Sequence, residues 1–331
     1  MSDELMKLTD IYVKLGDAPI LDGLGFDIMP GEILGLVGES GSGKSMTALT
    51  IMDLLPEGIR KTDGTLVFEG RDLDSLTPTQ RRRLLGKEIA MVFQDPMTSL
   101  NPLYTVGHQL IEALRIHNPR ISKKAALKAA LERLEEVEIL DPESAARKYP
   151  HQFSGGQRQR ICIAMALMNS PRLLIADEAT TALDVTVQYH ILELLRRLSK
   201  KHNMALLVIS HNLALIAHLC RRVLVLYTGM ILEEGTVAEV LKETRHPYTA
   251  ELLQSMPENA VKGEPIHTIP GRVPSLFEPK KLCPFYDRCP HAKPECLEPP
   301  LERFRFSETH YSRCQRSREI GELLQEEVGK L

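Results

Sequence analysis

The stretch Gly38-Glu39-Ser40-Gly41-Ser42-Gly43-Lys44-Ser45 decides the fold of this chain. It fits the pattern G-x-x-x-x-G-K-[ST] and follows the apolar run Ile33–Val37, and a helix is expected to run from near Lys44 to about Leu54. Glycines allow successive backbone N–H groups to turn toward phosphate oxygens, and a helix N-terminus favours negative charge. The stretch therefore predicts a phosphate-binding loop between a strand and a helix.

The loop and a later pair of carboxylates predict a nucleotide site. Lys44 is placed to reach the β and γ phosphates, and the Ser45 hydroxyl is a ligand for Mg²⁺. The apolar strand Leu173–Ala176 ends in Asp177 and Glu178. Beside a phosphate loop, Asp177 suits the Mg²⁺ shell, and Glu178 suits the polarisation of a water for in-line attack.

The rest of the chain alternates between strand and helix patterns. The β-type runs are residues 6–37, 65–69, 88–93, Leu173–Ala176 and Ala205–Ile209. Helical periodicity fills residues 103–169, where Lys123–Val137 is amphipathic, and returns in Val185–Lys200. This alternation predicts an α/β fold with a largely parallel sheet covered by helices.

The character of the sequence changes after about residue 245. Prolines become frequent, and four of the six cysteines fall between Cys283 and Cys314. We expect an irregular extension over residues 246–331 with a final helix near Glu319–Glu327.

Composition excludes several classes of protein. The net charge is −3 and the chain has no Trp, which argues against nucleic acid as a partner. No apolar run approaches the length of a spanning helix, and the start MSDELMK lacks the pattern of a signal peptide. We therefore expect a cytosolic chain that does not itself cross a bilayer.

A further set of motifs resembles one family. Phe153-Ser154-Gly155-Gly156-Gln157 is similar to the LSGGQ signature of ATP-binding cassette proteins. Other landmarks follow in the order of that family: Gln94 resembles the glutamine of the Q-loop, Ala182-Leu183-Asp184 resembles the D-loop, and His211 resembles the switch histidine.

The resemblance implies a P-loop NTPase (RecA-like) core with an antiparallel β subdomain and a helical subdomain at about residues 95–160, all within residues 4–245. It also implies that two such domains trap two ATP molecules between them. Catalysis would fall to Glu178 and His211. Mg²⁺ would be held by Ser45, Gln94 and Asp177. ATP would be bound by Gly38, Glu39, Ser40, Gly41, Ser42, Gly43, Lys44, Ser45 and Gln94, and by Ser154, Gly155, Gly156 and Gln157 of the facing chain.

Four positions depart from the family pattern. Ala179 replaces the usual proline after the carboxylate pair, Phe153 replaces the first leucine of the signature, and Asn212 replaces an aspartate. None of these changes removes a reactive group. Leu15 stands where an aromatic ring usually stacks on adenine, so the stacking residue is left open.

Several segments are similar to one branch of the family, the ATPases of dipeptide and oligopeptide importers. These segments are Gln94–Pro102, Tyr149–Gln152, Arg245–Thr249 and Ile269–Pro274. The similarity implies an ATP-hydrolysing subunit at the cytoplasmic face of the inner membrane. Its partners would be a second ATPase that is a different chain, two membrane permeases and an external solute-binding protein.

Three other functions stay open. The same fold can serve a nickel or metallophore importer of the same branch. A soluble cassette ATPase that acts in DNA repair or on ribosomes usually carries two cassettes or a long insertion, and this chain has neither. A nucleotide-binding regulator without catalysis would not need the complete set of Lys44, Asp177, Glu178 and His211.

The cysteines at 283, 289, 296 and 314 are separated by wider gaps than the usual pairs of zinc ligands. Four thiolates suit an iron–sulfur cluster, and the resemblance to the peptide-importer branch implies a [4Fe–4S] cluster at Cys283, Cys289, Cys296 and Cys314. Zinc and four unrelated thiols remain the alternatives.

Overall fold

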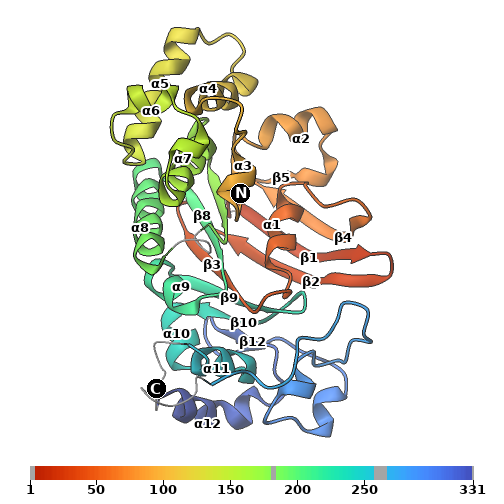
Figure 1. The fold of residues 1–331 in the computed structure, drawn as a ribbon. Helices are drawn as coiled ribbons and strands as arrows, with labels where there is room; N and C mark the ends of the chain where they lie inside the picture. Colours follow the sequence, from red (N-terminus) through yellow and green to blue (C-terminus); the bar gives the residue numbers. More distant parts are fainter. Residues whose placement is uncertain (1–3, 180–183, 257–266, 330–331) are drawn as a thin grey trace. The chain divides into compact units, whose positions relative to one another are not determined.

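The computed structural model describes residues 4–179, 184–256 and 267–329. The chain forms two compact units (Figure 1). The first unit contains the residues up to Leu5, Ile28–Ile33 and Phe68–Leu207, and the second contains Met6–Asp27, Leu34–Val67 and the residues from Val208 onward. Strand β8 (Ala205–Ser210) begins in the first unit and ends in the second.

The first unit contains the parallel strands β6 (Ile89–Val92) and β7 (Leu173–Asp177), which pair from Ile89 with Leu173 to Val92 with Ala176. Every residue of both strands is buried, which is the pattern expected for parallel strands covered on both faces. The carboxyl end of β7 therefore brings Asp177 to the edge of a rigid, buried element.

Helices make up most of the first unit. They are α2 (Pro78–Leu84), α3 (Pro96–Ser99), α4 (Val106–His117), α5 (Lys123–Glu136), α6 (Pro142–Arg147), α7 (Gly155–Leu167) and α8 (Val185–His202). Helices α4, α5, α6 and α7 pack on one another, as the helical periodicity of residues 103–169 predicts. Helix α8 ends where Asn203 adopts a left-handed conformation with φ of 47°.

The second unit contains two groups of strands (Figure 1). In one, β2 (Ala18–Ile28), β1 (Met6–Leu15) and β4 (Ile59–Phe68) are neighbours in that order. In the other, β3 (Ile33–Val37) runs parallel to β9 (Arg222–Tyr227), which pairs antiparallel with β10 (Met230–Thr236). Strand β4 begins earlier than the predicted residue 65. Its first half is polar and lacks an apolar face, so the sequence pattern gave no sign of a strand there.

Three helices of this unit surround the strands. Helix α1 (Lys44–Ile51) begins at the predicted residue but ends before Leu54, because Asp53 has a φ of 54°. Helix α9 (Leu213–Leu219) follows β8, and α10 (Val237–Lys242) follows β10. No helix among the residues described here is both long and apolar enough to span a bilayer.

The C-terminal extension is more regular than its composition predicts. Its elements are α11 (Pro247–Gln254), short 3₁₀ turns at Tyr286–Arg288 and Pro294–Leu297, β11 (Phe304–Arg305), β12 (Tyr311–Ser312) and α12 (Ser317–Gly329). Strand β12 pairs antiparallel with β10, and Ala250 of α11 packs with Ile320 and Leu324 of α12. The extension thus completes a sheet edge of the second unit.

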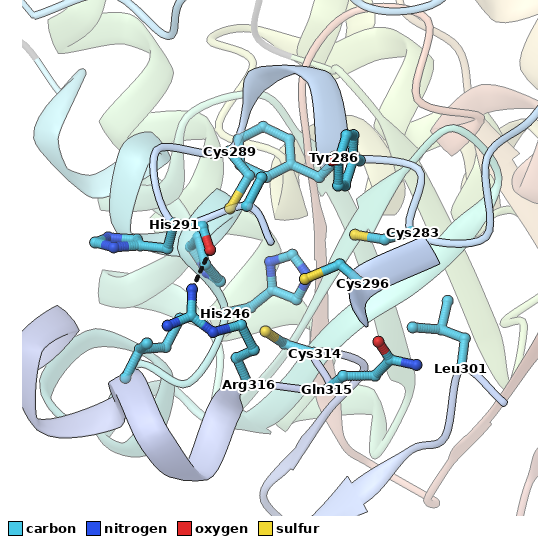
Figure 2. Close-up of a pocket in the computed structure, with 14 residues that line it drawn as sticks. His246, Cys283, Tyr286, Cys289, His291, Cys296, Leu301, Cys314, Gln315 and Arg316 are labelled. Carbon is cyan, nitrogen blue, oxygen red and sulfur yellow. Dashed lines mark hydrogen bonds between the residues drawn. The ribbon is translucent and has the colours of Figure 1, made fainter. Parts of the chain in front are cut away.

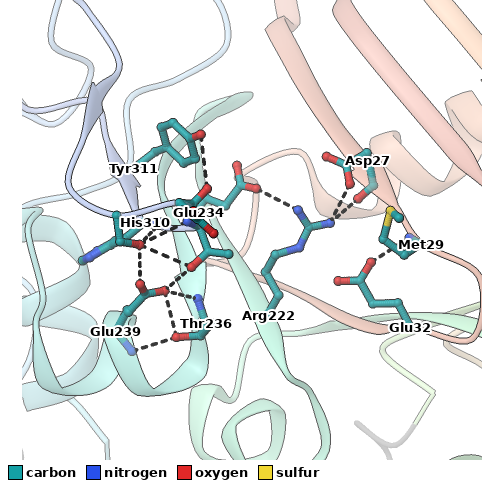
Figure 3. Close-up of polar contacts among 12 residues, drawn as sticks. Asp27, Met29, Glu32, Arg222, Glu234, Thr236, Glu239, His310 and Tyr311 are labelled. Carbon is teal, nitrogen blue, oxygen red and sulfur yellow. Dashed lines mark hydrogen bonds and ion pairs between the residues drawn. The ribbon is translucent and has the colours of Figure 1, made fainter. Parts of the chain in front are cut away.

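Charged side chains on and beside β10 hold the extension in place (Figure 3). Glu234, which is 3% exposed, pairs with Arg222 at 3.2 Å and with Arg303. The Glu239 carboxylate accepts hydrogen bonds from Thr236, Ser307 and Thr309. Burial opposes the charge of Glu239, but these hydrogen bonds outweigh it and lower the pKa of Glu239 to about 2.

We predict that Glu239→Gln destabilises the protein at neutral pH but not in acid. Because the folded-state pKa of Glu239 lies below the reference value of 4.5, its stabilisation is complete above that value and is lost as pH falls toward 2. The substitution should lower the unfolding temperature by about 3 °C at pH 7, and the difference should shrink below pH 4.5. Calorimetry at several pH values measures the unfolding temperatures, with Glu308→Gln at an exposed carboxylate as the control. If Glu239→Gln lowers the unfolding temperature by the same amount at every pH, the prediction is wrong.

Candidate nucleotide site and cysteine pocket

The phosphate loop requires glycine at its first position. Gly38 follows directly after β3 and has a φ of 155°, and a Cβ atom there would lie 2.1 Å from the carbonyl oxygen of Leu226 on β9. Gly43 has a φ of 106° and caps α1 without any side-chain hydrogen bond. The loop therefore turns tightly against the sheet, and its cap residue Gly43 adds no side chain over the N-terminus of α1, where the helix dipole favours phosphate oxygens.

Lys44 lies inside this loop. Its side chain is buried, with the residue 4% exposed, and Nζ donates to the carbonyl oxygens of Gly38 and Glu39, each at 2.9 Å. Because a buried ammonium without partners is costly, the loop's own carbonyls keep Lys44 charged and oriented. This arrangement places a positive charge in the middle of a ring of backbone groups.

The predicted catalytic carboxylate contacts the predicted Q-loop glutamine. Asp177 is the last residue of β7 and is 5% exposed, and Glu178 follows with a φ of 44°. Gln94 Nε2 donates to Glu178 Oε2 at 3.0 Å. The left-handed backbone at a non-glycine residue is unusual and turns Glu178 away from the strand direction, toward Gln94.

The signature stretch forms the start of α7, as predicted. Ser154 Oγ accepts from the N–H of Gln157, and Gln157 Oε1 accepts from the N–H of Ser154 at 3.0 Å, which together make a capping box. Ser154 is exposed, whereas Phe153 is buried at 8% exposure. Phe153 therefore serves as an apolar anchor and leaves the polar start of the helix at the surface.

The remaining predicted residues occupy a strand end and a helix cap. His211 is exposed directly after β8, and Asn212 caps α9 by accepting from the N–H of Leu215. Of the D-loop, Ala182 and Leu183 lie outside the described residues, and Asp184 caps α8 through the N–H of Val187.

The predicted residues divide between the two units. The loop 38–45, Leu15 and His211 belong to the second unit; Gln94, Asp177, Glu178 and residues 154–157 belong to the first. Within the units, the structure brings Gln94 to Glu178 and Lys44 to the loop carbonyls.

The four cysteines of the extension line one pocket (Figure 2). Cys283, Cys289, Cys296 and Cys314 share it with His246, which is fully buried. The Nδ1 atom of His246 accepts a hydrogen bond from the N–H of Tyr248, while Nε2 has no hydrogen-bond partner among the residues that the structure describes. Burial lowers the pKa of His246 to about 3, so the ring is neutral and contributes no charge to the pocket.

The pocket brings four thiols together, but among the described residues they do not form a metal-binding arrangement. Burial raises the pKa of Cys283 to about 11 and the pKa values of Cys289 and Cys314 to about 12, which keeps these thiols protonated at neutral pH. Across the described part of the chain, no group of three or more His, Cys, Asp or Glu residues is disposed to hold a metal ion. The donors suit iron in their chemistry, but the predicted cluster is not supported by their present geometry.

Sequence reasoning missed two residues that contact the phosphate loop. The N–H of Glu39 donates to the hydroxyl of Tyr248 at 2.8 Å, and the Glu39 carboxylate pairs with Arg288. Their sequence separations from Glu39 are 209 and 249 residues. Tyr248 lies in the segment Arg245–Thr249, whose similarity to peptide-importer ATPases did not predict a contact with the phosphate loop. No local sequence pattern marks Arg288 as a partner of that loop.

The fold and the loop geometry define a phosphate-loop nucleotide-binding protein. The profile of the ABC transporter family matches residues 21–181, and the profile described as "Oligopeptide/dipeptide transporter, C-terminal region" matches residues 232–296. The chain belongs to the ATP-binding proteins of the ABC transporter family, and with its complete nucleotide motifs it is an ATPase.

Relatives cover nearly the whole chain. "Probable peptide ABC transporter ATP-binding protein y4tR" of Sinorhizobium fredii is 47% identical over 94% of this chain and 93% of its own. "Dipeptide transport ATP-binding protein DppD" of Escherichia coli is 44% identical over 93% of this chain and 96% of its own. Among solved structures, the dimeric bacterial ABC transporter cassette MJ0796 has a TM-score of 0.62 and 28% identity, and covers 70% of this chain and 98% of its own.

Proposed function

We propose that the chain is the ATP-hydrolysing subunit of an importer for dipeptides and oligopeptides. The observation that carries this proposal is the combination of a formed phosphate loop with 44% identity to a dipeptide transport protein over 93% of the chain. The match of residues 232–296 to the C-terminal region of oligopeptide and dipeptide transporters supports the same cargo class.

We propose the following roles at the nucleotide site. Lys44 leaves the carbonyl oxygens of Gly38 and Glu39 and binds the β and γ phosphates when ATP enters the loop. Ser45, Asp177 and Gln94 would hold Mg²⁺, and the ion would offset the negative charge that develops on the phosphates during hydrolysis. The N–H groups at Ser154, Gly155 and Gly156 bind the γ phosphate of ATP held by a facing cassette.

Hydrolysis is assigned to Glu178 and His211. The Glu178 carboxylate accepts a proton from the attacking water, and His211 contacts the γ phosphate. The hydrogen bond from Gln94 orients Glu178 before the nucleotide is in place and couples the two groups. Closure of two cassettes around ATP would then pull on the permeases, and hydrolysis would release the closed state.

We predict that Glu178→Gln retains ATP binding but loses turnover. An amide keeps the size and the contact with Gln94 but accepts no proton, so the ATPase rate should fall by about 100-fold or more. Phosphate release and equilibrium binding of ATP measure the two properties separately. Glu143→Gln, at a carboxylate on α6 that is 74% exposed, is the matched control. A Glu178→Gln variant with normal turnover removes Glu178 from this role.

Two further features of the assembly are part of the proposal. We assign a cassette to residues 4–245 and a transporter-specific extension to residues 246–331. We also place the chain at the cytoplasmic face of the inner membrane, bound to two permeases, with a second ATPase and an external solute-binding protein in the complex. Copurification of integral membrane proteins with the tagged chain tests this placement.

The cargo is tested in a strain that lacks this chain. We predict that the strain loses uptake of a labelled dipeptide and regains it with the wild-type gene but not with Glu178→Gln. Growth under nickel limitation is measured beside it. Normal dipeptide uptake together with a nickel-dependent growth defect contradicts the peptide assignment and favours the metal-importing branch.

We propose that Cys283, Cys289, Cys296 and Cys314 bind a [4Fe–4S] cluster. The support is the soft four-thiol donor set that lines one pocket of the extension. Such a cluster would supply covalent cross-linking of distant chain segments. Because the thiols of Cys283, Cys289 and Cys314 are protonated at neutral pH, binding of a cluster would release protons and would be favoured by higher pH.

Anaerobic purification tests the cluster. We expect about four irons and four sulfides per chain with a visible charge-transfer band, and we expect Cys314→Ser to lose both. Cys162→Ser, at a buried thiol of α7 outside the pocket, is the control and should keep them. Protein without iron, or iron content that Cys314→Ser leaves unchanged, contradicts the proposal; bound zinc instead supports the alternative metal.

A further inference from the structure

An ion pair joins the extension to the phosphate loop, in addition to the hydrogen bond with Tyr248. Arg288 Nη1 lies 2.6 Å from Glu39 Oε2, and Nη2 lies 2.9 Å from Oε1, so the guanidinium binds the carboxylate in a bidentate geometry. The Arg288 side chain is 4% exposed and the Glu39 side chain is 25% exposed. A pair of this geometry and burial is specific in direction and costly to break.

Arg288 is held rigidly by the extension itself. Its Nε donates to the carbonyl oxygen of Pro270 at 2.8 Å, and Nη1 also donates to the Tyr227 hydroxyl at 3.3 Å. The guanidinium carbon lies 5.9 Å from the centre of the Phe285 ring. Burial alone would lower the pKa of Arg288, but the contacts with Glu39 and Tyr227 raise it, so the side chain stays charged.

Glu39 is the point at which three contacts meet. Its N–H donates to the Tyr248 hydroxyl at 2.8 Å, its carbonyl oxygen accepts from Lys44 Nζ at 2.9 Å, and its carboxylate binds Arg288. A displacement of the Glu39 side chain therefore moves the peptide group that orients Lys44. The extension controls that displacement from both sides, through Tyr248 and Arg288.

The charge of Glu39 also matters. A carboxylate within a loop that receives a triphosphate repels the ligand, and the repulsion is strong where water is partly excluded. Arg288 lies directly on this carboxylate and cancels its charge at close range. The loop thus keeps a residue that anchors it to the extension without presenting a net negative charge to ATP.

We propose that Arg288 is a positioning residue of the nucleotide site, which neutralises Glu39 and fixes the phosphate loop for ATP. The inference rests on the proposed role of residues 38–45 in binding the triphosphate. It makes the extension a contributor to nucleotide affinity in addition to any role in docking.

The test measures binding of a nonhydrolysable ATP analogue with Mg²⁺ to the full chain by calorimetry. Arg288→Gln leaves Glu39 charged and unpaired, and it should raise the Kd about tenfold, as expected for one uncompensated charge near an anion site. Addition of Glu39→Gln removes the repulsion and should restore the Kd to within about threefold of wild type. Arg272→Gln, at an extension arginine whose side chain is 82% exposed and pairs with Glu278, should bind as wild type.

Three outcomes would overturn the inference. One is wild-type affinity in Arg288→Gln. The second is a weakened Arg288→Gln that Glu39→Gln does not rescue, because general unfolding of the extension would give that result. The third is an equal loss in Arg272→Gln. Lys44→Ala separates this inference from the proposed function: if that variant still binds the analogue normally, residues 38–45 are not the nucleotide site.

Discussion

The nucleotide site depends on the burial of one ammonium group inside its own loop. Lys44 has little contact with water, and the carbonyl oxygens of Gly38 and Glu39 replace the lost hydration. That replacement is possible only because Gly38 turns where a side chain would collide with the carbonyl of Leu226. Sheet, loop and lysine are thus mutually dependent, and the cap residue Gly43 places no side chain over the N-terminus of α1.

The second unit shows how an appended segment becomes part of such a site. Strand β12 extends the sheet beyond β10. Tyr248 and Arg288, which both belong to the extension, contact Glu39 of the phosphate loop. Phe285 packs against the rings of both Tyr227 and Tyr248, so the arginine and the tyrosine are supported by one aromatic cluster. The extension and the nucleotide loop therefore share a single network of contacts.

The same short segment also contributes to the cysteine pocket. Cys283 and Cys289 flank Phe285 and Arg288, and both cysteines line the pocket that contains the neutral ring of His246 (Figure 2). A change in the position of residues 283–289 would alter both the pocket and the phosphate loop, because this segment contributes side chains to each.

The sequence by itself determined the phosphate loop, the helix that starts at Gly155, the buried strand that ends at Asp177 and the family, because each depends on local geometry that a short run of residues encodes. Local patterns could not supply the polar first half of β4, the strand β12 or the partners of Glu39. These features arise only when distant segments meet, since an arginine 249 residues away becomes a partner through folding alone. For the same reason, the sequence offered a shared site for the four cysteines only through the family resemblance, and only the tertiary structure shows that they line one pocket.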